Sequence, residues 1–374
     1  MVLYFVMFFV CLISAVSRNR QLQCSNNMNS CLYKQDYSVV FIVLIFACIA
    51  GFRYKLGGTD YDYYAYFYGL IKGEQGFFAT LSNSQYEVGY TTFVYLCANV
   101  LHLSFEGSLV VEAFIFYILM YVGLKKYMPN WGIFLMFFMY KMFFYVTFVA
   151  MRQAFTVAGF FVIMRYLEER KPLKYYASLA LVSTFHYGAM ILFVLYPIFG
   201  LNIKKERLAT FGVILGLSTL LSGMTGSLLN IVVNVLGMTQ LEDKAASYSA
   251  DASLNLLYTF EYFLLYILMV RNYDKIKQRF QHADFVIMLY LMVLPIVTLF
   301  RSTVILVREL PYFYPAYAIL LYYVYAVSKN RKIIFPVFVI LCLSGILKYI
   351  IQFDDGHFMH YKTWLFNPNV YFLQ

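Results

Sequence analysis

Two ionisable side chains interrupt long apolar stretches of the sequence, and both are of types that can do chemistry. Arg152, followed by Gln153, falls within the apolar run 131–167, and His186 falls within the run 173–201. A charge in the middle of a membrane costs about 3 kcal/mol even on the lenient insertion scale, so such residues are expected to have a function. The forked donors of arginine suit a phosphate or carboxylate, and histidine can donate to a phosphate oxygen or shuttle a proton. The alternative for Arg152 is a snorkelling helix end or a structural ion pair.

Carboxylates and tyrosines form a second group. Arg53 is followed by a Gly-Gly pair, Asp60 and Tyr64, and Glu87 opens the next apolar run. Carboxylates can act as bases or accept hydrogen bonds from sugar hydroxyls, and aromatic rings can stack on sugar faces. The alternatives are an interfacial aromatic belt for the tyrosines and a favourable helix-dipole interaction for Glu87.

A third group lies toward the carboxyl terminus. Arg301 and Arg308 flank a short connection that leads to Tyr312. The distribution of charge places this connection on the non-cytoplasmic side, where two cations run against the usual bias and therefore favour a ligand role. The alternative is a water-exposed pair of Arg308 with Glu309, which would contribute little.

The composition predicts a membrane protein. Hydrophobic residues are 62% of the chain and charged residues 13%, with a mean hydropathy of +0.67, whereas a soluble domain is about half apolar and a quarter charged. The net charge of +10 is spread over short connections between apolar runs. Positive-inside loops near anionic lipids have this pattern, so we expect membrane lipids or lipid-linked molecules as partners, and no nucleic acid.

The apolar stretches predict an all-α polytopic integral membrane protein of about 11–13 transmembrane or half-spanning helices, since a full crossing takes about 20 apolar residues. We expect residues 1–374 to form a single membrane domain with two sizeable loops, 53–87 and 224–253. The first apolar run lacks a basic leader and a small-residue cleavage site, so we expect it to be retained as a span. The candidate helices are 2–16, 37–52, 88–104, 107–124, 131–150, 152–167, 173–186, 188–201, 208–223, 254–270, 284–300, 310–327 and 333–351.

The basic residues also predict which helix ends share a side of the membrane. Both ends of 173–201 are basic, which predicts a hairpin that turns at His186. Lys125, Lys126 and Arg165 predict in the same way that 131–167 is a hairpin turning at Arg152.

Carried along the chain, the same rule places 301–309 and the tail 352–374 outside. Toward the amino terminus the number of predicted crossings does not agree with this rule. If 88–104 and 107–124 both cross, then 53–87 falls on the cytoplasmic side, unless one of these two segments lies in the interface instead of spanning. The cations that the rule places outside would together suit an anionic lipid pyrophosphate, and the aromatic segments beside them would suit sugars.

The ordered set of these motifs resembles the EpsG-type family, which includes Wzy-like O-antigen and exopolysaccharide polymerases. The resemblance covers nearly the whole chain. It is carried by Gly58-Thr59-Asp60 with Tyr64, Glu87-x-Gly89-Tyr90, Arg152-Gln153, Phe185-His186, Arg301 and Arg308.

The resemblance implies a GT-C-like glycosyltransferase in the bacterial inner membrane that joins undecaprenyl-diphosphate-linked repeat units at the periplasmic face. The loops 53–87 and 224–253 would then be periplasmic. It further implies a separate chain-length regulator protein as a possible partner.

Carried over residue by residue, the resemblance implies a metal-independent site that needs no cofactor. The cations would hold the donor diphosphate, and Asp60 or Glu87 would accept the proton of the acceptor hydroxyl. The candidate catalytic residues are Asp60, Glu87, Arg152 and His186, and the candidate substrate-binding residues are Arg53, Tyr64, Gln153, Arg301, Arg308 and Tyr312.

Other functions remain open on the sequence. A flippase or transporter of lipid-linked oligosaccharide would favour internal repeats and ionisable residues along a path through the bilayer, and we find neither. A membrane acyltransferase usually has a carboxylate next to its histidine, which His186 lacks. An O-antigen ligase-type or single-sugar transferase is poorly separated from a polymerase.

Overall fold

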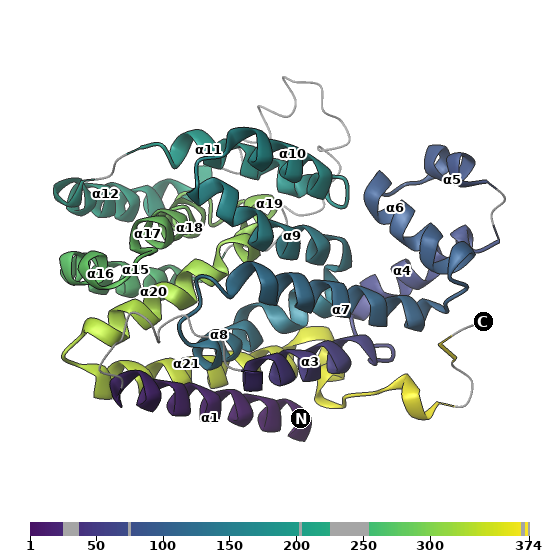
Figure 1. The fold of residues 1–374 in the computed structure, drawn as a ribbon, viewed down its shortest axis with the longest axis horizontal. Coiled ribbons are helices and arrows are strands. Elements are labelled where there is room, and N and C mark those ends of the chain that lie inside the picture. The colour runs from purple at the N-terminus through teal and green to yellow at the C-terminus, as the bar shows by residue number, and fades with distance from the viewer. Residues whose placement is uncertain (25–36, 74–75, 202–203, 225–253, 368–370, 373–374) are drawn as a thin grey trace. The chain divides into compact units, whose positions relative to one another are not determined.

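The computed structural model is helical throughout the part of the chain that it describes, which is residues 1–24, 37–73, 76–201, 204–224, 254–367 and 371–372 (Figure 1). Four helices are long and apolar enough to cross a membrane, or five if a pair bent by 58° counts as one span. Five shorter apolar helices accompany them. The prediction of an all-α polytopic membrane protein is confirmed. The expected loop 224–253 lies, apart from its first residue, outside the described residues.

The described chain divides into two compact units. Unit 1 comprises residues 1–198 and 333–374, and unit 2 comprises residues 199–332. The expectation of a single membrane domain stays a prediction. The helices of unit 1 are α1 (Val2–Cys24), α3 (Tyr37–Gly51), α4 (Gly58–Ile71), α5 (Phe77–Asn83), α6 (Val88–Tyr95), η1 (Leu96–Val100), α7 (Phe105–Leu124), α8 (Trp131–Phe138), η2 (Met139–Phe143), η3 (Tyr145–Val149), α9 (Met151–Glu168), α10 (Pro172–Ser183), η4 (Tyr187–Val194), α11 (Leu195–Ile198), α21 (Arg331–Gln352), η7 (Phe353–Met359) and η8 (Trp364–Phe366).

The centre of unit 1 is α7, which packs between α3 and α9. Glycines allow these helices to approach closely. A Cβ atom on Gly51 would lie 2.9 Å from the Cα of Val110, and one on Gly123 would lie 2.5 Å from the carbonyl carbon of Phe161. Small residues at such crossings are typical of helix packing in membranes, where backbone proximity replaces the hydrophobic driving force.

One end of unit 1, which we call the basic end, is formed by residues 124–131, 165–171 and 196–198. Lys126 forms a 2.7 Å ion pair with Glu168, which also accepts a 3.0 Å hydrogen bond from the hydroxyl of Tyr127. Arg170 donates to the carbonyl of Tyr196 at 2.5 Å. Three connections that are far apart in sequence therefore meet here.

Both predicted hairpins are confirmed, because each begins and ends at the basic end. The chain leaves it through α8, η2 and η3, breaks at Ala150, and returns along α9. It leaves again through α10 and returns through η4 and α11, and the hydroxyl of Tyr175 joins the two arms by donating to the carbonyl of Leu192 at 2.6 Å. The two turns, at Ala150–Arg152 and Thr184–His186, lie at the other end of unit 1. We call this the turn end and include residues 50–58 and 103–106 in it.

Contacts at the turn end also bear on how many helices cross the membrane near the amino terminus. The helix pair α6–η1 follows Glu87, which contacts Arg152, and it ends before Leu103, whose carbonyl accepts a 2.9 Å hydrogen bond from Tyr68. Both ends of the pair therefore contact the turn end, as expected if 88–104 lies in the interface and does not span. The segment 53–87 is not an irregular loop, because α4 and α5 occupy most of it.

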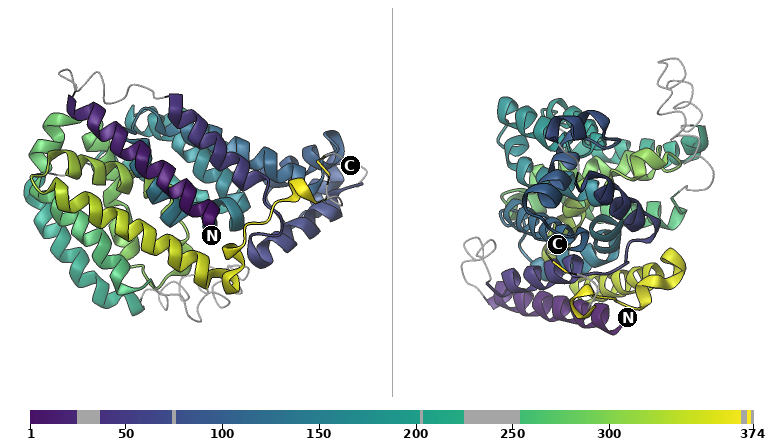
Figure 2. Two further views of the ribbon diagram at one scale, coloured as in Figure 1. Left: turned by 90° about the horizontal axis from the view of Figure 1, so that it is seen from below. Right: turned by 90° about the vertical axis from the view of Figure 1, so that its right-hand side faces the viewer.

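The amino terminus and the tail belong to the same end of unit 1 (Figure 2). The amino group of Met1 donates to the carbonyl of Met359, while Asn19, farther along α1, accepts a 2.9 Å hydrogen bond from Asn130 near the basic end. The backbone N–H of Tyr54 donates to the carbonyl of Lys362 at 2.9 Å. The tail is thus tied to the end of α3.

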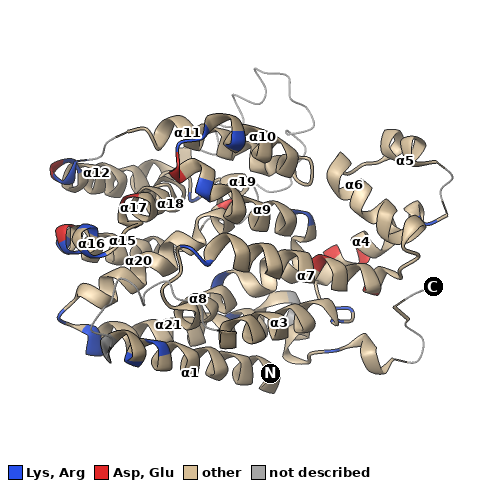
Figure 3. Ribbon diagram, in the orientation of Figure 1, with Lys and Arg blue, Asp and Glu red and all other residues tan. Residues whose placement is uncertain are grey.

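Unit 2 also has two distinct ends. At one end Lys205 pairs with Asp274, and Arg279 donates to the carbonyl of Ala326 at 2.9 Å. At the other, the N–H of Leu254 donates to the carbonyl of Arg301 at 2.9 Å. Lysine and arginine gather at such helix ends and connections (Figure 3). The helices of unit 2 are α12 (Lys205–Ser218), η5 (Thr219–Leu221), α15 (Leu256–Arg271), α16 (Tyr273–Arg279), α17 (Ala283–Leu291), α18 (Val293–Val297), α19 (Val304–Val307), η6 (Leu310–Tyr312) and α20 (Tyr314–Val327).

Candidate functional site

Four breaks in the chain meet at the turn end of unit 1 and carry most of the predicted site residues. Two glycines allow the breaks to approach. Gly57, before α4, has φ +146°, and a Cβ atom there would lie 2.4 Å from the carbonyl oxygen of Phe148. A Cβ atom on Gly89 in α6 would lie 2.4 Å from the hydroxyl of Thr184, whose carbonyl accepts a 2.8 Å hydrogen bond from the Gly89 N–H.

Glu87 is the centre of the site. One carboxylate oxygen, Oε2, accepts a 2.6 Å hydrogen bond from Nη1 of Arg152. The other, Oε1, lies 3.2 Å from Nδ1 of His186 and 3.3 Å from the backbone nitrogen of Tyr187. A single buried carboxylate therefore joins three segments that are 65 and 99 residues apart in sequence.

Arg152 is held from three sides and still has a donor to offer. Its Nε donates to the hydroxyl of Tyr64 at 3.3 Å, and its guanidinium lies over the ring of Tyr86 at 4.3 Å from the centroid. Within the described residues, Nη2 of Arg152 and Nε2 of His186 make no hydrogen bond. The two side chains are 25% and 21% exposed, so an incoming ligand can reach them.

The electrostatics of the site favour a persistent anion at Glu87. Burial raises the pKa of Glu87, but the hydrogen bond from His186 and the charge of Arg152 outweigh it and lower the pKa from 4.5 to about 2. A carboxylate with so low a pKa, and with both oxygens engaged, is a weak base near neutral pH. Its geometry instead fixes the orientation of Arg152 and His186.

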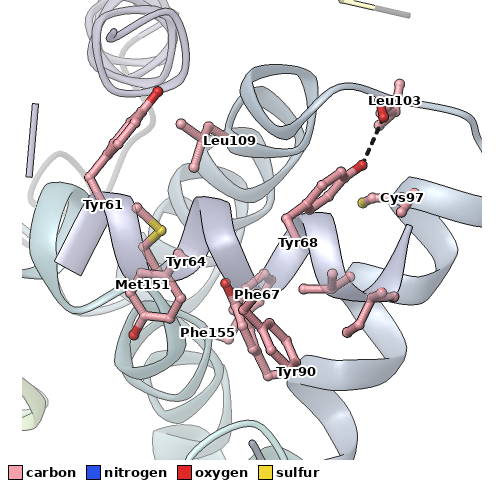
Figure 4. Close-up of a cluster of buried hydrophobic side chains, with 13 residues drawn as sticks. Tyr61, Tyr64, Phe67, Tyr68, Tyr90, Cys97, Leu103, Leu109, Met151 and Phe155 are labelled. Atoms are coloured by element: carbon pink, nitrogen blue, oxygen red, sulfur yellow. Dashed lines mark hydrogen bonds between the residues drawn. The ribbon is translucent and has the colours of Figure 1, made fainter. Parts of the chain in front are cut away.

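Aromatic side chains surround this polar group. Figure 4 shows Tyr64 and Phe67 from α4 beside Tyr90 from α6 and Phe155 from α9. The rings of Phe155 and Phe185 stack at 5.0 Å, which holds the turn that carries His186 against α9. These rings are buried against one another, and their packing fixes the positions of the polar residues.

Asp60 belongs to the same region. It lies one helical turn before Tyr64 in α4 and is half-buried, so the two side chains share one face of the helix. Its charge acts on both Tyr64 and Tyr86, the two tyrosines that contact Arg152.

Arg53 and Gln153 occupy different surroundings. Arg53 is 1% exposed. It donates to the carbonyl oxygens of Ala50 at 2.5 Å and Leu56 at 3.3 Å, and it lies over the ring of Phe148. Gln153 is 3% exposed on the inner side of α9. Neither offers its side chain to a ligand at the surface, so their substrate-binding roles stay predictions without support from these contacts.

The remaining predicted residues lie in unit 2. Arg301, Arg308 and Tyr312 surround the bend between α18 and α20, and Tyr312 is fully buried. Two nitrogens of Arg301, Nε and Nη1, are buried and have no hydrogen-bond partner among the described residues. The convergence of these residues with Arg152 and His186 stays a prediction.

Three contributors to the site were missed in the sequence. They are Tyr86 under the guanidinium of Arg152, the backbone N–H of Tyr187, and the Phe155–Phe185 stack. Tyr86 directly precedes Glu87, and this adjacency was an available signal; the other two depend on the turn before η4. Among the described residues, no group of three or more His, Cys, Asp or Glu side chains could hold a metal ion.

A comparison with family models shows which protein family the chain belongs to. The model of the EpsG family matches residues 36–363, which is nearly the whole chain. The chain belongs to the EpsG family. This match confirms the resemblance drawn from the motifs, and the match covers Glu87, Arg152 and His186. No curated protein and no solved structure matched this EpsG-family chain.

Proposed function

We propose that this EpsG-family protein is a polysaccharide polymerase that transfers a glycan from its undecaprenyl diphosphate to a hydroxyl of an incoming lipid-linked repeat unit. The observation that carries the proposal is the bridge made by Glu87. It holds Arg152 and His186 side by side and leaves Nη2 of Arg152 and Nε2 of His186 unengaged among the described residues. Nη2 donates to a phosphate oxygen, and Nε2 does so when the imidazole is protonated, as a diphosphate leaving group requires.

In the proposed reaction, the acceptor oxygen forms a bond to the anomeric carbon of the donor sugar as the bond from that carbon to the diphosphate oxygen breaks. Negative charge grows on the diphosphate, where Arg152 and His186 stabilise it. The resulting diphosphate is already a good leaving group, so the mechanism requires no separate general acid. The same arrangement would act as a GT-C-like glycosyltransferase without a bound metal or cofactor.

The acceptor proton needs a base, and the geometry favours Asp60 over Glu87. Glu87 is occupied by Arg152, His186 and the N–H of Tyr187. Asp60 is half-buried on the same face of α4 as Tyr64. We therefore assign Asp60 as the base and Glu87 as the residue that positions Arg152 and His186. Tyr64 and Tyr86 would lie next to the sugar.

The orientation follows from the two ends of unit 1. The basic end carries Lys125, Lys126, Arg170 and Lys171 and is expected to face the cytoplasm. Glu87, Arg152 and His186 lie at the turn end, about 25 Å away along α9, and would face the periplasm of the inner membrane. Arg301 and Arg308 are expected to assist in holding lipid diphosphate, and a chain-length regulator would be a separate partner.

A deletion strain tests the proposed function. Its surface polysaccharide should be reduced to single repeat units, and the wild-type gene should restore the ladder of longer chains. Loss of all surface glycan would instead indicate a flippase, and retention of long polymer that fails to reach lipid A core would indicate a ligase. The same strain tests the site when it is complemented with Arg152→Ala, which should also leave single repeat units. Lys126→Ala, which removes an exposed cation at the basic end, is the matched control and should restore the ladder.

A further inference from the structure

The helices between α3 and α7 have an outer surface that no described residue of unit 1 covers. We call α4, α5, α6 and η1 the cap helices. In α4, the inner face buries Tyr61, Tyr64 and Tyr68. The opposite face exposes Tyr63 by 65% and Tyr66 by 66%. Asp62 is exposed on the same face. The outer face therefore combines aromatic rings with one carboxylate, whereas a surface helix in water has a largely polar outer face.

The other cap helices also expose large apolar side chains and, apart from Ser82, Asn83 and Gln85, few polar ones. Phe78 in α5 is 81% exposed, and Val100 at the end of η1 is 55% exposed. Between residues 76 and 101 the only charged residue is Glu87, which is buried in the site. So many exposed large apolar side chains on a soluble protein would indicate a site of association.

The cap helices cannot cross a bilayer. The pair α6–η1 contains 13 residues (88–100) and is about 20 Å long, whereas the hydrocarbon core is about 30 Å thick. Glu87 ties the start of the pair to Arg152 and His186, and Leu103, just after it, is tied to Tyr68. Both ends of this pair are therefore held by contacts within unit 1, at the turn end and on α4.

We propose that the cap helices lie in the headgroup–acyl boundary of the leaflet at the turn end, with the exposed face of α4, Phe78 and Val100 buried in lipid. Tyrosine suits this boundary because its ring is apolar and its hydroxyl is polar. The cap helices lie between α3 and α7 in the chain, and α7 is long and apolar enough to cross a membrane, so lipid is the occupant of this surface. Arg152 and His186 then lie at the depth of a lipid diphosphate.

The proposal concerns where the cap lies and does not depend on the reaction. It is tested with the full-length protein in phosphatidylcholine nanodiscs, using Tyr66→Trp and Phe78→Trp as fluorescent probes. Both positions are exposed, so either replacement leaves the core intact, and the native Trp131 and Trp364 are buried and give a constant background in the parent protein. Ile340→Trp in α21 serves as the spanning control and Lys171→Trp at the basic end as the aqueous control.

Phosphatidylcholine brominated near the headgroup should quench the indoles of the Tyr66→Trp and Phe78→Trp variants more strongly than lipid brominated near the chain end. Ile340→Trp should show the opposite preference, and Lys171→Trp should be quenched by iodide in the buffer. Two results would overturn the proposal. Quenching of both cap probes by iodide would place the cap in water, and protection from both lipid and iodide would mean that a second copy or another protein covers it.

Discussion

Arg53 and Arg152 lie at the same end of unit 1 and differ in what they contact. Arg53 is 1% exposed and donates to two backbone carbonyls, and Glu112 lies close enough for its charge to act on it. The side chain of Arg152 is 25% exposed, is oriented by Glu87, and keeps Nη2 unengaged within the described residues. Arg53 stabilises a turn of the backbone, whereas Arg152 is accessible to a ligand. An arginine between apolar runs can have either role, and only its contacts separate the two.

The largest expected effect is on stability, from Arg53→Leu. The change removes the donors to the carbonyls of Ala50 and Leu56, which lie at a buried turn. A buried acceptor left without its donor costs about 1–3 kcal/mol. The amount of folded protein in the membrane and its thermal midpoint should both fall. In the double variant with Glu112→Leu the loss should be smaller than the sum of the single changes. An Arg53→Leu protein as stable as the wild type would contradict the role of Arg53 in stabilising this turn.

Arg152→Ala should have the second largest effect, a loss of activity that is measured at equal amounts of folded protein. Removal of one donor that stabilises developing charge reduces a rate by about 100-fold to 1000-fold. Glycan ladders from cells that express equal amounts of protein should collapse to single repeat units. Arg152→Lys should recover only part of the activity, because an ammonium cannot contact Glu87, Tyr64 and a phosphate in the same geometry. Long ladders from Arg152→Ala would remove Arg152 from the site.

His186→Ala is expected to be milder than Arg152→Ala. The histidine provides one donor, and positioned side chains that transfer or share a proton contribute about 100-fold or more. His186→Asn can still donate from its amide and should keep more activity than the alanine variant. The lengths and amounts of lipid-linked products in membranes measure both. Equal activity of the two variants would argue against a donor role for His186.

The ion pair of Glu87 should persist far into acid. Its pKa is lowered from 4.5 to about 2, so the carboxylate contributes stability above pH 4.5 and loses it as the pH falls through about 2. The difference in thermal midpoint between the wild type and Glu87→Gln should therefore stay constant from neutral pH down to pH 4.5 and shrink below it. A difference that shrinks already between pH 7 and 5 would mean that Glu87 is not held by Arg152 and His186.

The smallest effect is expected at the basic end. Lys126 is 42% exposed and pairs with Glu168, and an exposed pair of this kind contributes about 0–1 kcal/mol. Lys126→Ala should leave both the ladder and the thermal midpoint close to those of the wild type. A loss of polymer from this variant would mean that the basic end, and not only the turn end, is needed for activity.

Part of this arrangement was readable in the sequence. Basic residues at both ends of 173–201 predicted the turn at His186, and the same reasoning predicted the turn at Arg152, because charge near a helix end reports its side of the membrane. The placement of 88–104 could not be predicted, because its hydropathy is that of a membrane span. Only the contacts of Glu87 and Leu103 show that its two ends are held within the same region of unit 1. Arg53 was grouped with the ligand-binding residues because burial is a property of the fold and not of the local sequence.

The most direct test is the release of undecaprenyl diphosphate by the purified protein in nanodiscs, supplied with a lipid-linked repeat unit. The wild type should release one undecaprenyl diphosphate for each new glycosidic bond, and Arg152→Ala should release it at least about 100-fold more slowly while remaining folded. Equal rates of release from the two proteins would contradict the assignment of Arg152 and His186 to the leaving diphosphate.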